Sequence, residues 1–426
     1  MQTSISAAPA QAVPFTEKKY IPTLIFVSSL FLLWAIAITM GDVLNKHFQN
    51  VLHVSKAQSG LVQFSIFGAY AIMGIPAGLF MKRFGYKNGV LLGLGLYAAG
   101  AFLFVPAANM AAPADAFTFF RVALFVLACG LATLEAVAHP FMAALGDQRT
   151  SDQRLNFAQS FNGVGAVVGP LLGRYFILGG TQAHVSGDLT SVKTLYLAIG
   201  SVILAIAMCF SFIKVPALPE AHAETHAEPE AGFYSGTAEE VPQARTLFQF
   251  PHFRWAWLAQ FFNVAAQGGT WAYFINYGVE KMHFSDETSA GYFSLFMVMM
   301  MSGRFVGTFL MRYIAPSRLL AVFALANVLM CVLVAQSWGW PSFIALLLIN
   351  FFFSIMFPTI FSLGIKDLGR YTQQGSSILV MAVAGGAVFP YLMGKIANHD
   401  IAAAYYLPIV CYAFIALFGA RLYRLR

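Results

Sequence analysis

Three ionisable side chains lie within long apolar stretches of this 426-residue chain: Asp42, Glu135 and Arg304. Glu135 is the most informative, because its immediate neighbours are Leu, Ala and Val and no Lys or Arg lies within one helical turn. Apolar surroundings disfavour the charged form of a carboxyl group, so such a group can take up and release a proton near neutral pH. The sequence therefore predicts that Glu135 carries a proton; the alternative is a neutral carboxyl that makes a structural hydrogen bond.

Two further residues extend this chemistry. His139 follows Glu135 by four residues, on the same face of a helix, and could adjust its protonation; alternatively, it only packs beside Pro140. Asp42 lies near the end of the first apolar stretch, where it either belongs to a site or simply marks a helix end. Asn45 follows Asp42 at i+3, so a carboxylate and an amide would face one place, which suits a ligand with many hydroxyl groups.

Neutral polar residues form two stripes with helical spacing. The first contains Gln159 and Asn162, and the second contains Asn263, Gln267 and Trp271, followed by Tyr273 and Asn276. We expect the glycines 268 and 269 to interrupt the helix that carries the second stripe. An amide can bind two neighbouring hydroxyls, and an aromatic ring can stack on the apolar face of a sugar. Membrane helices also use Asn and Gln to contact one another, but the combination favours a sugar-binding site.

Arg304 lies eight residues before Arg312, which places it about 12 Å inside the end of its helix at 1.5 Å per residue. A cation at this depth needs a partner or a water-filled space. The sequence predicts a structural ion pair or a gate contact for Arg304, and direct substrate binding is the alternative.

Membrane helices must position these residues. Hydrophobic residues make up 59% of the chain and charged residues only 10%, with a mean hydropathy of +0.69, whereas about a quarter of a soluble domain is charged. Since a span needs about 20 apolar residues, the sequence predicts an all-α membrane protein with twelve transmembrane helices. We expect these helices near residues 20–47, 58–82, 88–106, 116–145, 154–178, 193–214, 252–281, 288–313, 318–337, 341–365, 373–397 and 403–424.

One long polar stretch divides the helices into two groups of six. It is rich in Glu and Pro, which is typical of a solvated linker. Similar short segments follow the second and eighth helices and end the fourth and tenth, which favours two parallel repeats. The predicted organisation is a cytoplasmic tail (1–19), a six-helix bundle (20–214), a cytoplasmic linker (215–250) and a second six-helix bundle (251–426), with the binding site between the bundles.

Basic residues and missing motifs narrow the function. Lys and Arg concentrate on the side of the tail and the linker, which predicts that both termini are cytoplasmic. The chain has no P-loop, no H-E-x-x-H and no G-x-S-x-G, so we expect transport driven by an ion gradient and neither an enzyme nor a sugar receptor. We expect no signal peptide, cofactor, metal site or nucleic-acid partner. The four cysteines lie in apolar runs and are predicted to be small buried residues: Cys129, Cys209, Cys331 and Cys411.

Six segments resemble the fucose:proton symporter family of the major facilitator superfamily. In order along the chain they read DVLNKHFQ, LEAVAHP, LNFAQSFN, AQFFN, GRF and PTIFSLGIK, and they start at Asp42, Leu134, Leu155, Ala259, Gly303 and Pro358. The resemblance implies a monomeric carrier of the inner membrane that imports a monosaccharide with a proton by alternating access. L-fucose is the first candidate; glucose, galactose, N-acetylglucosamine and coupling to sodium are the alternatives.

The resemblance also implies roles for individual residues. The acidic residues of the family's first and fourth helices, implicated in proton coupling and sugar binding, match Asp42 and Glu135. The polar residues of its fifth and seventh helices match Gln159, Asn162, Gln267, Trp271 and Tyr273. The L-fucose carriers have Asn at or near four positions where this chain has Ile38, Thr39, Gly41 and His139. We therefore expect Thr39 and His139 to modulate the choice of sugar.

Overall fold

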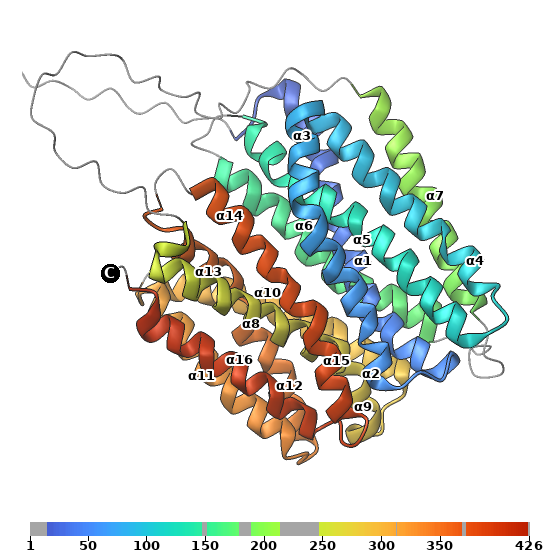
Figure 1. Cartoon of the computed structure of the whole chain (residues 1–426), viewed down its shortest axis with the longest axis vertical. Coiled ribbons are helices and arrows are strands. Elements are labelled where there is room, and N and C mark those ends of the chain that lie inside the picture. The colour runs from blue at the N-terminus through green and yellow to red at the C-terminus, as the bar shows by residue number, and fades with distance from the viewer. Residues whose placement is uncertain are drawn as a thin grey trace, which may run out of the picture.

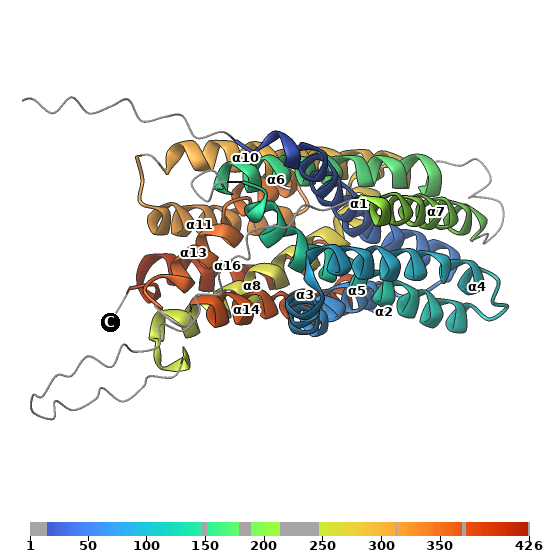
Figure 2. The same cartoon turned by 90° about the horizontal axis from the view of Figure 1, so that it is seen from above.

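The computed structural model describes residues 15–146, 151–178, 189–213, 247–311, 313–368 and 372–424. These residues are almost entirely helical and contain no strand. The first half (blue to green) and the second half (yellow to red) form two bundles that lie side by side (Figure 1, Figure 2). Most of the predicted tail 1–19 and of the predicted linker 215–250 lies outside the described residues.

The first half crosses six times. Each crossing is a helix, because an apolar segment in a membrane satisfies its own backbone groups only in that form. Its elements are α1 (Ile21–Val51), α2 (Lys56–Ser59), α3 (Leu61–Phe102), α4 (Phe104–Ala108), α5 (Pro113–Ala144), α6 (Ser151–Gly173) with a π-helical turn (Arg174–Leu178), and α7 (Thr190–Phe212). The second and third predicted helices are joined within α3 by a corner at Gly85, which has a left-handed φ of 81°. Glycine adopts this conformation without the steric cost of a β-carbon.

The second half repeats the arrangement with more interruptions. Its elements are α8 (Pro251–Ala272), α9 (Phe274–Met282), α10 (Asp286–Leu310), α11 (Pro316–Ala335), α12 (Trp340–Phe353), α13 (Met356–Ile365), α14 (Thr372–Met381), α15 (Gly385–Ala397), α16 (Leu407–Leu417) and the π-helical turn η8 (Phe418–Leu422). Three of the passages are therefore built from two helices each. The seventh comprises α8 and α9, the tenth α12 and α13, and the eleventh α14 and α15.

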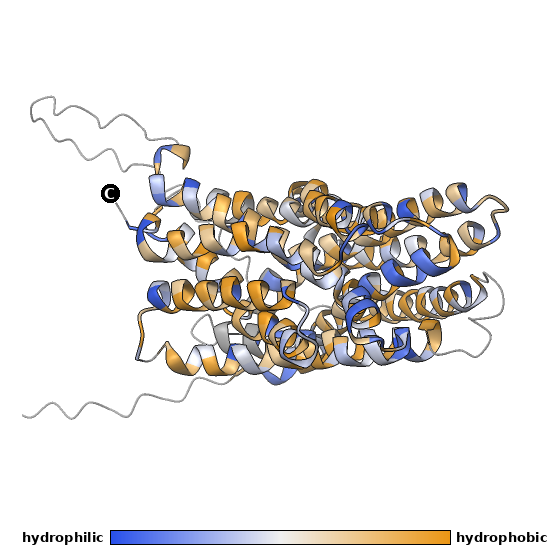
Figure 3. Cartoon of the chain, turned by 90° about the horizontal axis from the view of Figure 1, so that it is seen from below, coloured by the Kyte–Doolittle hydropathy of each residue, from blue (hydrophilic) through white to orange (hydrophobic). Residues whose placement is uncertain are grey.

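Eleven helical segments of the described chain are long and apolar enough to cross a membrane. Apolar residues dominate these helices over most of their length (Figure 3). The passage formed by α8 and α9 is not among the eleven, and it carries the predicted polar stripe. With this passage the fold has the twelve helices in two bundles that the sequence predicts, and the chain is a multi-pass membrane protein.

The seventh passage is interrupted, but not where the sequence predicts. Helix α8 continues through Gly268 and Gly269 and ends at Ala272, and Tyr273 separates it from α9. The expectation that the glycine pair breaks the helix is therefore wrong. A β-carbon on Gly268 would lie 3.2 Å from the α-carbon of Gly386, so this glycine instead allows α8 and α15 to approach closely.

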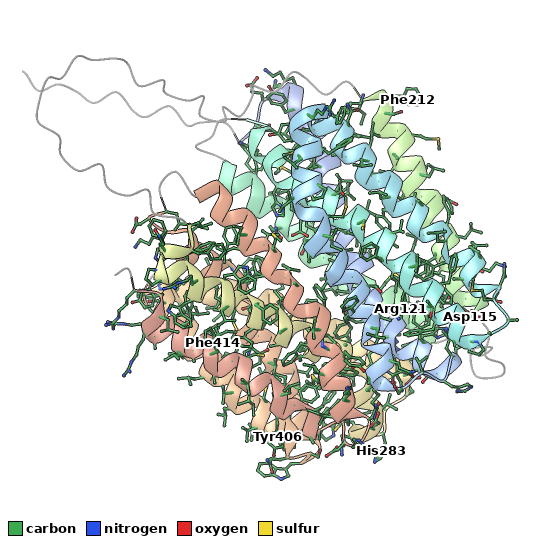
Figure 4. The ribbon with its side chains drawn as sticks, viewed as in Figure 1. Asp115, Arg121, Phe212, His283, Tyr406 and Phe414 are labelled. Atoms are coloured by element: carbon green, nitrogen blue, oxygen red, sulfur yellow. The ribbon has the colours of Figure 1, made fainter. Side chains whose placement is uncertain are left out.

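The two ends of the bundles differ. We call the end near residue 15, the end of α7 and the C-terminus the terminal face, and the opposite end, with α2, α4 and α9, the distal face (Figure 1). In Figure 4, Phe212 marks the terminal face, and Asp115 and His283 mark the distal face. Between the halves, α6 lies beside α10 and α3 lies beside α15 (Figure 2).

Candidate functional site

His139 connects the fourth and fifth passages. Its Nδ1 lies 2.9 Å from the backbone oxygen of Glu135, and its Nε2 lies 3.1 Å from the side-chain nitrogen of Gln159. Because a carbonyl oxygen only accepts, Nδ1 carries the proton, and Nε2 then accepts a hydrogen bond from the Gln159 amide. The two bonds fix the orientation of the imidazole between α5 and α6.

The Glu135 carboxyl group is half-buried beside His139. The Tyr70 side chain of α3 lies near it, and its hydroxyl interacts with the carboxyl group. The nearby polar groups are thus an imidazole and a phenol, and no described Lys or Arg acts on the carboxyl group. This environment matches the apolar surroundings that the sequence indicates.

Helix α1 supplies aromatic rings to the same place. The ring centroids of Phe31 and Trp34 lie 5.2 and 5.7 Å from that of His139. Asn162 of α6 donates a hydrogen bond to the Phe31 carbonyl oxygen at 3.3 Å. Three helices of the first half thus bring together one set of side chains, which we call the N-half cluster: Phe31, Trp34, Glu135, His139, Gln159 and Asn162.

Asp42 and Asn45 lie closer to the distal face than this cluster. Asp42 is 3% exposed and accepts a hydrogen bond at 2.5 Å from the Gln63 amide of α3. Asn45 is fully buried and donates a 2.7 Å hydrogen bond to the backbone oxygen of Ala272, where α8 ends. Since the helix break leaves that carbonyl without a helical partner, Asn45 satisfies it across the two halves.

Further polar contacts join the halves near the distal face. The amides of Gln49 and Asn276 pair with each other, and the Tyr273 hydroxyl donates to the backbone oxygens of Lys56 and Pro390, both at 2.8 Å. Three ion pairs accompany them: Lys46–Asp286 at 3.8 Å, Lys56–Glu280 at 2.8 Å and Arg174–Glu287 at 3.1 Å. We call this set, with Asn45, the distal latch. It closes the space between the halves at this face.

The remaining predicted residues of the second half lie in its interior. The Trp271 indole nitrogen donates to Asn350 of α12 at 3.2 Å, and the Asn350 amide donates to the Phe296 backbone at 2.8 Å. Gln267 is half-buried, and its amide has no partner among the described residues. Trp271 and Tyr273 are therefore held by protein contacts here and do not lie together on one open surface.

Buried amides without partners are the feature that the sequence argument missed. Gln260 and Asn263 of α8 and Asn327 of α11 are fully buried, and neither the nitrogen nor the oxygen of any of the three side chains has a hydrogen-bond partner. A buried unpaired polar group costs about 1–3 kcal/mol. Gln260 precedes Asn263 by three residues, so its helical spacing was the signal that could have identified it.

Thr39 and Arg304 make no side-chain hydrogen bond or ion pair with another described helix. The Thr39 hydroxyl bonds to the backbone oxygen of Ala35 at 2.9 Å in its own helix, and the side chain packs against Gly169 of α6. Arg304 of α10 is exposed and forms no ion pair with a described residue. The structure thus does not contain the predicted structural ion pair of Arg304 within the described chain.

The geometry divides the predicted residues into separate groups. Glu135, His139, Gln159 and Asn162 meet in the N-half cluster, whereas Asn45, Tyr273 and Asn276 belong to the distal latch. Amides in the cluster can bind hydroxyl groups, and the neighbouring carboxyl can hold a proton. The described residues contain no group of three His, Cys, Asp or Glu side chains placed to hold a metal ion.

Comparisons with known proteins agree with this architecture. Residues 23–390 match the model of the Major Facilitator Superfamily. The chain is 37% identical to the L-fucose-proton symporter of Escherichia coli K12 over 95% of this chain and 93% of that protein. It is 34% identical to a glucose/galactose transporter of Brucella abortus, with 98% of both chains covered.

Solved structures show the same fold. The crystal structure of the E. coli fucose:proton symporter has 36% sequence identity and a TM-score of 0.65, and the match covers 95% of this chain and 99% of that one. An inward open structure of the E. coli xylose transporter has a TM-score of 0.72 at 11% identity, with 95% and 96% of the chains covered.

Proposed function

Because the chain belongs to the major facilitator superfamily, and within it to the family of the L-fucose-proton symporter, we propose that it imports a monosaccharide together with a proton, with L-fucose as the first candidate. The observation that carries the proposal is the N-half cluster. There, a half-buried carboxyl without a basic partner lies beside amides that can bind hydroxyls and aromatic rings that can pack on a sugar.

In the proposed mechanism Glu135 holds the transported proton. Gln159 and Asn162 bind sugar hydroxyls. Trp34 and Phe31 are 3% and 0% exposed in this structure, so they contact the apolar face of the ring only after the halves move apart. The Gln159 amide now bonds to His139, so a sugar hydroxyl would exchange one hydrogen bond for another. Coupling requires that the sugar binds more tightly when Glu135 is protonated, since otherwise the proton gradient transfers no free energy to the sugar.

In the proposed cycle of alternating access, the distal latch opens and closes one side of the carrier. The proposal places the terminal face in the cytoplasm and the distal face outside the inner membrane, in agreement with the distribution of Lys and Arg. With its latch closed, the carrier is shut toward the outside. Opening the latch while the halves meet at the terminal face would expose the N-half cluster to the outside. Asp42, behind the latch and bonded to Gln63, would sense this movement or relay the proton. A single chain contains both halves, so a monomer suffices.

The test is uptake into proteoliposomes. We expect an inward proton gradient to drive accumulation of labelled L-fucose, and unlabelled L-fucose to compete more strongly than other hexoses. Uptake that follows a sodium gradient but not a proton gradient would contradict proton coupling. No uptake of any hexose under either gradient would contradict the proposed function as a whole.

A second sugar remains a specific candidate. Relatives of 34% identity are named glucose/galactose transporters, and His139 and Thr39 stand where the L-fucose carriers have Asn or lie close to it. Competition by D-glucose or D-galactose above that by L-fucose would assign the chain to this alternative and leave the mechanism unchanged.

A further inference from the structure

A pocket opens on the terminal face of the second half, away from the N-half cluster. It has a volume of about 230 Å³ and is lined by Leu363, Lys366, Tyr423 and Arg424. Helices α13, α16 and α11 come together there beside the C-terminus (Figure 1). None of its residues takes part in the proposed sugar site.

The pocket lies at the level where three membrane spans end. The span Trp340–Ile365 ends one residue before Lys366, and the span Ala403–Leu422 ends one residue before Tyr423. The span Pro316–Ala335 begins two residues before Arg318, which acts on the Tyr423 hydroxyl. Residues directly beyond an apolar span lie among the phospholipid headgroups.

The pocket is positively charged. Lys366, Arg424 and Arg318 are exposed, and none of them forms an ion pair with a described residue. The Tyr423 hydroxyl interacts with Ser317 and Arg424, and the hydrogen bond with Ser317, together with the charges of Arg424 and Arg318, lowers the pKa of this hydroxyl. Two cations and a phenol therefore line the pocket, and the charge of a third cation, Arg318, acts on the phenol.

The acidic residue that neighbours Lys366 in the sequence forms no ion pair with it. Asp367 follows Lys366, and it acts on His252 of α8. His252 in turn holds the backbone oxygen of Lys366, with its Nε2 at 2.9 Å. The Lys366 backbone is thus held by His252, while its exposed side chain lines the pocket.

The helices beside the pocket expose apolar side chains. Helices α11 and α16 pack against each other, and both expose apolar side chains: Val322, Leu325, Val410 and Leu417. A ligand at this place would meet cations at its head and hydrocarbon along its length. A soluble anion would use only the first of these features.

We propose that this pocket binds the phosphate headgroup of an anionic phospholipid, with Lys366, Arg424 and Arg318 on the phosphate and the acyl chains along α11 and α16. Lys and Arg at the cytoplasmic membrane surface attract anionic lipids in this way. The Tyr423 hydroxyl donates to a phosphate oxygen. The bound lipid ties the ends of the ninth, tenth and twelfth passages together.

The experiment is native mass spectrometry of the purified full-length carrier with added cardiolipin, phosphatidylglycerol or phosphatidylcholine. We expect tight adducts with the two anionic lipids and weak adducts with phosphatidylcholine. Lys366→Gln and Arg424→Gln should each weaken cardiolipin binding about five-fold, the effect of one cation near an anionic headgroup, and the double variant should weaken it further. Lys366→Arg should keep the binding.

Arg421→Gln is the matched control, because Arg421 is exposed near the same helix end but does not line the pocket. An equal loss of cardiolipin binding with Arg421→Gln would mean that general surface charge, and not the pocket, attracts the lipid, and it would overturn the proposal. Equal binding of phosphatidylcholine, or displacement of cardiolipin by millimolar inorganic phosphate, would also overturn it. Thermal unfolding of each variant without lipid checks that the fold is kept, and the readout does not depend on which sugar is carried.

Discussion

Gln49 and Asn276, which lie 227 positions apart in the sequence, pair their amides in both directions across the two halves, with nitrogen–oxygen distances of 2.6 and 3.3 Å. A second bond ties the Gln49 amide to Ser59 at 2.9 Å. The pair is the most symmetric contact of the distal latch. The two residues belong to passages that must separate when the carrier opens outward. We therefore expect the pair to stabilise the state in which the distal face is closed.

Asn276→Ala should shift the carrier toward the outward-open state. The change removes both hydrogen bonds of the pair. At about 1 kcal/mol for each bond, it destabilises the closed state by about 2 kcal/mol. The measurement is the labelling rate of a cysteine placed at Ala57, with the exposed Cys209 replaced. We expect the rate to rise about 30-fold.

The control for the latch is Gln336→Ala. Gln336 donates to the Tyr406 hydroxyl at 3.0 Å near the same face, but both residues belong to the second half. This variant should leave the labelling rate unchanged. An equal increase in the two variants would mean that the distal face loosens generally, and the role of the Gln49–Asn276 pair as a latch would be lost.

Glu135→Gln should abolish proton-driven accumulation of the sugar and leave counterflow exchange intact. Glutamine keeps the size and polarity of a protonated carboxyl but cannot release a proton. Uptake and counterflow are measured in the same proteoliposomes. Asp115→Asn, on the exposed distal end of the same helix, is the control and should retain both activities. Loss of counterflow as well would assign Glu135 to sugar binding or folding in place of coupling.

Gln159→Leu should weaken sugar binding. The side chain then no longer donates to a sugar hydroxyl or to His139, and the loss of one hydrogen bond corresponds to about three- to ten-fold in affinity. Isothermal calorimetry or counterflow at varied sugar concentration measures it. His139→Asn restores the residue type of the L-fucose carriers and should raise the preference for L-fucose over D-glucose. If neither variant alters affinity or preference, the sugar does not bind in the N-half cluster.

Gln260→Leu should stabilise the protein and impair transport. The Gln260 amide is fully buried without a partner, so an apolar residue of similar size removes a desolvation cost of about 1–3 kcal/mol. Such a costly group is retained where activity needs it. The measurements are the thermal unfolding midpoint in detergent and the sugar uptake rate.

Asn350→Leu is the matched control for Gln260→Leu. Asn350 is equally buried, but its amide is satisfied by Trp271 and by the Phe296 backbone. This change leaves the buried Trp271 indole N–H unpaired, removes the additional bond to the helical carbonyl of Phe296, and should lower the unfolding midpoint. If Gln260→Leu also lowers the midpoint, the amide has a protein partner in solution and the argument from its isolation does not hold.

The sequence by itself determined the twelve passages, the two halves and the spacing of the polar residues of the N-half cluster, whereas its aromatic residues, Phe31 and Trp34, were found only in the structure. Hydropathy locates the spans, because a helix is the form in which one apolar segment satisfies its own backbone in a membrane. The spacing of Glu135 and His139 on one helix, and of Gln159 and Asn162 on another, is local and follows from the helical repeat. These properties need no knowledge of neighbouring helices.

Tertiary structure alone decided which polar residues meet. Tyr273 and Asn276 were predicted to contact a ligand. In the structure they bond to Lys56 and Gln49 of the first half and are part of the distal latch. The break at Tyr273 and not at the glycine pair exposes the Ala272 carbonyl to Asn45. The partners of such groups lie more than 200 positions away, so no local pattern contains them. The same holds for Gln260, because its amide is unpaired only where the neighbouring helices place no hydrogen-bonding group within reach.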